Sequence, residues 1–155
     1  MSVPRRQPGR RFHFHTSLQV RFRDVDVKGH VNHAVYFSYF EMARCEYWMS
    51  LFSLARLSDI DFIVVRAECN YLQPAQYAEW LDIYVAVTGI RNSSFVMEYE
   101  AKARRPRRVV ATGSTIQVIY DYSRDQSKRV PSPVRRKIER FEKRPLSPAL
   151  LTVKR

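Results

Sequence analysis

The chain has 155 residues, of which 45% are hydrophobic and 13% aromatic. This length fits one domain of ordinary size, and the composition excludes a disordered or collagen-like polypeptide. No run approaches the roughly 18 consecutive apolar residues that a membrane-spanning helix needs. Cys45 and Cys69 lie far apart and match neither a zinc motif nor a disulfide framework. Since no segment resembles a secretory signal, we expect a protein of the reduced cytoplasm.

The formal net charge of +12 comes from the two ends of the chain. Residues 1–12 contain four arginines and no acid, and residues 124–155 contain eleven basic and three acidic residues. Residues 13–123 carry twelve residues of each sign and are neutral. We therefore predict a basic flexible tail (1–12), one folded domain (13–123) and a basic C-terminal extension (124–155). A nucleic-acid surface needs cations and aromatic residues clustered on a folded face, so nucleic-acid binding is not expected.

The first predicted elements are a strand and a long helix joined by a loop. Apolar and polar side chains alternate over residues 14–22, and this period of two is typical of a half-buried strand. Acidic residues and Gly29 interrupt the pattern over residues 24–29, which indicates a loop. Residues 33–52 contain neither glycine nor proline, and their apolar residues predict a helix that other elements surround on most sides. Asn32 is the expected N-cap of this helix.

Four further strands and a short helix follow. Residues rich in Val, Ile, Tyr and Phe predict strands near 61–72, 79–90, 94–104 and 108–121. Turn-forming residues at 89–93 and 104–107 predict hairpins between the later strands. Ser132 and Pro133 begin a short charged helix that extends to about Glu142. The order is that of an α+β domain, with the long helix packed on a five-stranded antiparallel sheet.

Two adjacent segments resemble a family signature. Residues 20–36 read VRFRDVDVKGHVNHAVY, and residues 39–44 read YFEMAR. This pattern resembles the signature of the 4-hydroxybenzoyl-CoA thioesterase family, and the similarity is dense over residues 15–50. It continues more loosely through NYLQPA at 70–75 and RNSSF at 91–95. The resemblance implies the hot-dog fold, in which a curved antiparallel sheet wraps a long helix, and it implies acyl-CoA thioesterase activity.

Thioester hydrolysis requires a base or nucleophile at the carbonyl carbon and hydrogen-bond donors for the developing oxyanion. A helix N-terminus supplies such donors, since its first amides are unpaired and carry positive partial charge. Asp26 lies seven residues before His33, in the loop that leads into the long helix. The resemblance implies that Asp26 is the catalytic carboxylate, acting as nucleophile or as base toward water, and that the His33 amide polarises the carbonyl. Asp24 is expected to be structural and paired with Arg21 or Arg23.

Other chemistry-bearing residues have simpler explanations. A second catalytic carboxylate on the long helix, as another branch of hot-dog thioesterases uses, would be Glu41 or Glu46. Glu41 is better explained as an ion-pair partner of Arg44, three residues further along the helix. His30 and His33 do not complete a zinc site, because the other two histidines lie in or beside the first strand. We therefore predict no metal, and no serine or cysteine lies in a nucleophile elbow.

Coenzyme A carries phosphates, which require cations near the mouth of the pocket. Arg91, Ser93 and Ser94 lie in the predicted hairpin turn where the CoA-binding segment of the family often lies, and the basic run at 102–108 is the alternative. The acyl pocket is expected between aromatic residues of the long helix and the strand over 61–72. The predicted substrate contacts are Gly29, Val31, Asn32, Tyr36, Arg91, Ser93 and Ser94.

The main hypothesis is an acyl-CoA thioesterase without a cofactor, since CoA is part of the substrate. An acyl carrier protein thioester is the alternative substrate, because an acidic carrier would suit the same cations. The Asp-x-x-Gly-His-Val-Asn loop argues against a hot-dog dehydratase, and the neutral body argues against a non-catalytic basic binding protein. Hot-dog proteins resemble one another in pairing subunits, so we expect a homodimer or homotetramer without membrane association.

Overall fold

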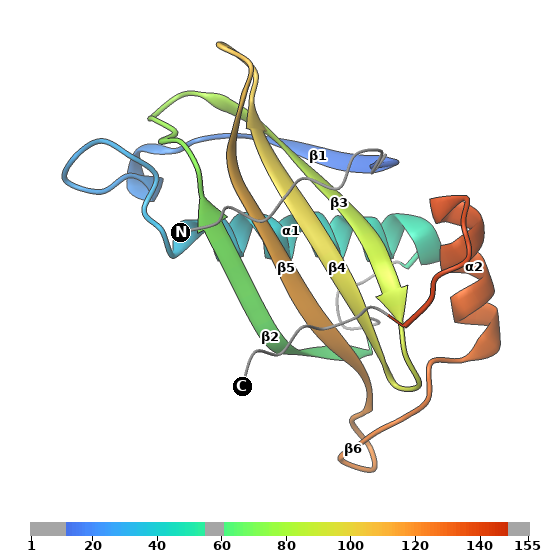
Figure 1. The fold of residues 1–155 in the computed structure, drawn as a ribbon. Coiled ribbons are helices and arrows are strands. Elements are labelled where there is room, and N and C mark those ends of the chain that lie inside the picture. Colours follow the sequence, from blue (N-terminus) through green and yellow to red (C-terminus); the bar gives the residue numbers. More distant parts are fainter. Residues whose placement is uncertain (1–11, 55–60, 149–155) are drawn as a thin grey trace.

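The long helix α1 (Val35–Phe52) packs against a curved antiparallel sheet in the computed structural model, which describes residues 12–54 and 61–148 (Figure 1). Its buried side chains recur every three or four residues and form one stripe: Tyr36, Tyr39, Phe40, Ala43, Arg44, Tyr47, Trp48 and Leu51. On the other side of the helix, Phe37 is 36% exposed. The sheet thus covers one side of α1, and the expectation of a helix surrounded on most sides is wrong for the single chain.

The sheet contains five long strands and one short strand. Their order is β1-β3-β4-β5-β2, so β1 and β2 form the edges, and β6 pairs with the end of β5. The strands are β1 (Phe14–Gln19), β2 (Phe62–Tyr71), β3 (Trp80–Ile90), β4 (Ser94–Ala103), β5 (Arg108–Asp121) and β6 (Gln126–Ser127). The four strands predicted after the helix are confirmed to within one residue at each end. The predicted five-stranded sheet omitted β6, because two residues are too few to show an alternating pattern.

The first strand ends earlier than the alternation predicts. Its last residue is Gln19, and the chain then enters a short 3₁₀ helix, η1 (Phe22–Asp24). Phe22, which the pattern assigned to the buried face, is 78% exposed. The alternation continues for three residues after β1 ends, and at Phe22, where η1 begins, it no longer reports burial.

Asn32 is not the N-cap of α1. The helix begins at Val35, and Ala34 occupies the N-cap position without a side-chain hydrogen bond. Asn32 Oδ1 instead accepts the N–H of Ala34 at 3.0 Å, which closes a turn before the helix. The prediction was therefore wrong by two residues, because the side chain of Asn32 is used in this turn.

The C-terminal extension contributes to the core. Helix α2 (Ser132–Glu142) has the predicted bounds, and its Ile138 side chain is completely buried. Glu142 is 3% exposed, and its Oε1 accepts hydrogen bonds from the Tyr47 hydroxyl at 2.8 Å and the Val87 amide at 3.0 Å. Burial raises the pKa of Glu142. These contacts join α2 to both α1 and β3.

None of the described helices has the length and hydropathy needed to cross a lipid bilayer.

Two aromatic stacks fill the space between α1 and the sheet. Phe40 stacks on Tyr99 with ring centroids 4.7 Å apart, and Trp48 stacks on Phe95 at 5.2 Å. Gly113 of β5 lies directly beneath the Phe40 ring, which occupies the position where a Cβ atom would lie. The approach of α1 to the sheet therefore requires glycine at this position.

We expect Gly113→Ala to lower the free energy of unfolding by about 1–3 kcal/mol, the usual cost of overpacking a core. The added methyl group would overlap the Phe40 ring and would lie 2.7 Å from the carbonyl oxygen of Glu68. Urea denaturation measures the change, with Thr112→Ala on the opposite face of β5 as the control for this strand. An unfolding free energy equal to that of the wild type would show that Phe40 moves without cost.

Candidate active site

The chain between β1 and α1 folds back on itself, and residues 24–34 are here named the site loop. Val25 and Val31 form an antiparallel bridge, and the N–H of Asn32 donates to the carbonyl of Asp24 at 2.9 Å. Gly29, at the turn between these segments, adopts a φ of +77°, which favours glycine. The site loop therefore brings its acidic residues to the amino end of α1 (Figure 1).

Asp24 anchors the site loop. Its carboxylate is buried and accepts hydrogen bonds from the Arg21 guanidinium at 3.0 and 3.1 Å, and from the Tyr39 hydroxyl at 2.9 Å. Burial alone would raise the pKa of Asp24, but the hydrogen bonds from Arg21 and Tyr39 outweigh it and lower the pKa below its usual value. The predicted structural pairing is confirmed for Arg21. Since Tyr39 belongs to α1, Asp24 connects the start of the loop to the helix.

Asp26 lies on the exposed side of the site loop. Its Oδ1 accepts the backbone N–H groups of Lys28 at 2.8 Å and His30 at 3.3 Å. The hydrogen bond from the Lys28 amide is the main cause that lowers the pKa of Asp26, and it outweighs a smaller opposing effect of desolvation. The carboxylate is therefore ionised at neutral pH. Its Oδ2 makes no hydrogen bond within residues 12–54 and 61–148, so it is available to a substrate or a water molecule.

The amino end of α1 offers a free hydrogen-bond donor at His33. Ala34, the N-cap, provides no side-chain acceptor, and the first turn contains no acidic residue. No residue in the part of the chain that the structure describes accepts the N–H of His33. Such an amide, at the positive end of the helix dipole, is suited to stabilise a developing oxyanion.

The remaining predicted contacts near the site loop have different environments. Gly29 is exposed at the turn, whereas the Val31 side chain is buried and its N–H donates to the Ala75 carbonyl at 2.8 Å. Tyr36 is buried beneath the first turn of α1, and burial raises its pKa to about 12. Gly29, Val31 and Asn32 belong to the site loop and Tyr36 to the first turn of α1, and the contact of these residues with a substrate stays a prediction.

Sequence reasoning did not single out Tyr71. This residue ends β2, and its hydroxyl donates to the backbone carbonyl of His33 at 2.9 Å. Its ring also lies against the Tyr36 ring, with centroids 5.5 Å apart. Tyr71 lies in the NYLQPA segment that resembles the family, but this segment does not reveal the contact with His33, which spans 38 positions.

Arg91, Ser93 and Ser94 do not lie near Asp26 within one chain. They form the turn between β3 and β4, where the Arg91 amide donates to the Ser94 carbonyl at 2.7 Å. This turn lies beside Phe95, which stacks on Trp48 near the carboxyl end of α1 (Figure 1). The 18 residues of α1 span about 27 Å, so the turn and the site loop lie at opposite ends of the helix.

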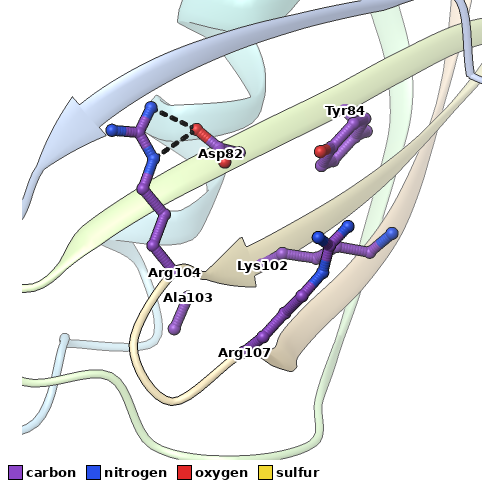
Figure 2. A pocket seen from close by; sticks show the side chains of 6 residues that line it. All are labelled: Asp82, Tyr84, Lys102, Ala103, Arg104 and Arg107. Atoms are coloured by element: carbon purple, nitrogen blue, oxygen red, sulfur yellow. Dashed lines mark hydrogen bonds and ion pairs between the residues drawn. The ribbon is translucent and has the colours of Figure 1, made fainter.

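The second basic run lies at the same end of the sheet as the site loop. Three of its cations form ion pairs: Lys102 with Glu100 at 2.6 Å, Arg104 with Asp82 at 2.7 Å, and Arg108 with Glu79 at 2.8 Å. Figure 2 shows Arg104 turned toward Asp82. Both residues line a hollow of about 90 Å³, together with Tyr84, Lys102, Ala103 and Arg107. Most of the positive charge of this run is thus neutralised by neighbouring carboxylates.

The two cysteines do not provide a thiolate nucleophile. Burial raises the pKa of the Cys69 thiol to about 11 and also raises the pKa of Cys45. Both thiols are therefore protonated at neutral pH, and the thiol is the unreactive form. The protonated state of both thiols leaves the carboxylate of Asp26 as the candidate nucleophile or base of the site loop.

The helix, the curved sheet and the loop at the amino end of α1 define a hot-dog fold. The sequence model of the thioesterase-like superfamily matches residues 20–138, so the chain belongs to this superfamily. A thioesterase from Thermus thermophilus, solved in complex with coenzyme A and Zn, superposes with a TM-score of 0.79 and is 33% identical. The superposition covers 87% of this chain and 98% of that structure.

Two curated proteins are similar in sequence. YsmA of Bacillus subtilis is 32% identical over 88 residues, which span 57% of this chain and 60% of YsmA. The long-chain acyl-CoA thioesterase FadM of Escherichia coli is 27% identical over 133 residues, which span 83% of this chain and 98% of FadM. The match to YsmA thus covers less than two thirds of that relative, whereas the match to FadM covers nearly all of it.

Proposed function

We propose that the protein hydrolyses an acyl-CoA thioester to the free acid and CoA. The observation that carries the proposal is that the site loop at the amino end of α1 contains two groups: the ionised carboxylate of Asp26 and the free N–H of His33. The similarity to FadM, a long-chain acyl-CoA thioesterase, and to a thioesterase solved with coenzyme A supports this substrate class.

In the proposed reaction the thioester carbonyl oxygen accepts the His33 N–H, and the helix dipole stabilises the oxyanion. Asp26 then acts in one of two ways. As nucleophile, its carboxylate oxygen bonds to the carbonyl carbon, CoA leaves as the thiolate, and water hydrolyses the resulting mixed anhydride. As base, it removes a proton from a water molecule that attacks the same carbon and displaces the thiolate. Both routes use the same geometry.

We further propose that the active site is shared between two subunits. Arg91 lies at the far end of α1 from Asp26, so it reaches a CoA bound at the site loop only if a second chain supplies it. The edge strand β2 favours such pairing, because it presents an unpaired backbone and apolar side chains. The exposed hydrophobic residues of β2 are Val64, Val65 and Tyr71, and Leu72 in the adjoining loop is also exposed.

Asp26→Asn is expected to lower kcat by about a hundredfold or more, the usual scale for loss of a positioned base. KM should change little, since the carboxylate acts on the reacting carbon and not on the CoA moiety. Thiol release from a panel of acyl-CoAs of varied chain length and aromaticity measures both constants, with an acyl carrier protein thioester in parallel. The asparagine Oδ1 still accepts the Lys28 and His30 amides, so the loop is preserved.

Asp24→Asn is the control for this variant, and it should lower stability more than turnover because Asp24 is buried against Arg21 and Tyr39. A folded Asp26→Asn protein that retained most of the wild-type turnover would contradict the proposed mechanism.

The pH dependence of kcat/KM follows from the lowered pKa of Asp26. Because the carboxylate stays ionised below the ordinary aspartate value, activity should be constant from about pH 5 to neutrality and should fall only at lower pH. A pH profile with a substrate that is stable to acid measures this limb. An inflection near pH 6.5 would instead assign the base to an imidazole, whose ordinary pKa is about 6.5.

A mixing experiment tests the shared site. The Asp26→Asn and Arg91→Ala variants are unfolded together and refolded at equal concentration, then assayed at substrate concentrations below KM. Mixed dimers contain one site with both native residues, so the mixture should recover about a quarter of the wild-type rate. Activity equal to the average of the two separate variants, or sedimentation as an 18.4 kDa monomer at micromolar concentration, would refute the shared site.

A further inference from the structure

Tyr71 joins the edge of the sheet to the turn that precedes α1. It is the last residue of β2, and its hydroxyl donates to the His33 carbonyl at 2.9 Å across 38 positions of sequence. The side chain is 49% exposed, so its hydroxyl is not placed by burial in the core. The hydrogen bond is the specific contact between this side chain and the backbone of the site loop.

The His33 carbonyl has no helical partner. In a continued helix it would accept the N–H of Phe37, but that group donates to the Ala34 carbonyl at 3.2 Å. The N–H of Val35 donates to the Asn32 carbonyl at 3.0 Å. The peptide plane that contains this carbonyl is therefore held by two contacts, the Tyr71 hydroxyl on the His33 oxygen and Asn32 Oδ1 on the Ala34 N–H.

Two peptide planes meet at His33, and the His33 carbonyl lies in the plane after this residue whereas its N–H lies in the plane before it. Peptide units are planar, so holding the His33 carbonyl fixes one of the two peptide planes that meet at His33. The other plane contains the His33 N–H and the Asn32 carbonyl, which accepts from Val35. With both planes held, the N–H points in one direction. The Tyr71 ring is itself oriented by edge contacts with the rings of His33 at 6.4 Å and Tyr36 at 5.5 Å.

We infer that Tyr71 is a positioning residue of this site: its hydroxyl holds the peptide plane after His33, which restrains the His33 backbone so that its N–H faces the thioester carbonyl. The inference rests on the proposed thioesterase function. Tyr71 acts through the backbone, and its own contact with substrate is not required. The residue belongs to the edge strand, so the geometry of the oxyanion donor depends on the placement of β2.

Tyr71→Phe keeps the ring and removes the hydroxyl. We expect kcat to fall about tenfold with KM nearly unchanged, because a misdirected donor weakens binding of the transition state more than binding of the substrate. The matched control is Tyr122→Phe, since the Tyr122 hydroxyl also donates to a backbone carbonyl, that of Phe62, at 3.3 Å. This variant loses the same type of hydrogen bond at the opposite end of β2, so its kcat should equal that of the wild type.

A spectroscopic measurement reports the donor directly. The carbonyl stretching frequency of a thioester bound to the slow Asp26→Asn variant is recorded by difference infrared spectroscopy, with and without Tyr71→Phe. Loss of polarisation by the His33 N–H should raise this frequency in the double variant.

The outcomes separate the inference from the proposed function. A wild-type protein that hydrolyses none of the thioesters overturns the proposed function and the inference with it. An active wild type combined with an unchanged kcat and carbonyl frequency in Tyr71→Phe overturns the inference alone. Equal losses of kcat in Tyr71→Phe and Tyr122→Phe also overturn it, since they would reflect general loss of stability.

Discussion

The buried carboxylate of Asp24 is the interaction on which the candidate site depends. This carboxylate accepts hydrogen bonds from the Arg21 side chain before the site loop and from the Tyr39 hydroxyl on α1. The backbone carbonyl of Asp24 accepts the Asn32 N–H near the end of the loop. One residue therefore fixes both ends of the site loop relative to the helix. A buried carboxylate is stable only with such partners, which outweigh the cost of its desolvation. Asp26, two residues later, is left exposed and ionised at the surface of the anchored loop.

The length of α1 imposes the second constraint. The aromatic stacks of Phe40 and Trp48 hold this helix along the sheet, so its amino end and its carboxyl end lie far apart. The proposed catalytic groups, the Asp26 carboxylate and the His33 N–H, both belong to the loop at the amino end, where the unpaired amides of the helix lie. The turn that contains Arg91 is at the other end, held by the guanidinium of Arg135, which donates to the Arg91 carbonyl at 3.2 Å. The proposed pairing of two subunits would bring the Arg91 turn of one chain to the site loop of the other.

Much of the fold could be predicted, because each strand of an antiparallel sheet with one buried face shows an alternation of apolar and polar residues in its own sequence. Strands β3 and β5 alternate buried and half-buried side chains over most of their length, and the sequence shows the same period. The predictions were wrong at residues whose local pattern does not match their position in the folded chain. Phe22 continues the alternation of β1 after the chain has turned away, and Asn32 has the chemistry of an N-cap but uses it in a preceding turn.

By itself the sequence determined the order of elements, the family resemblance and the placement of Asp26 and His33 on one loop before a helix, because these depend on neighbouring residues. Only the tertiary structure decided that the Tyr39 hydroxyl donates to the buried carboxylate of Asp24 and that Tyr71 holds the His33 carbonyl. It also decided that Arg91 lies at the opposite end of α1. These facts join residues that are distant in sequence, and no local periodicity or motif encodes which distant side chains the packed sheet and helix bring together.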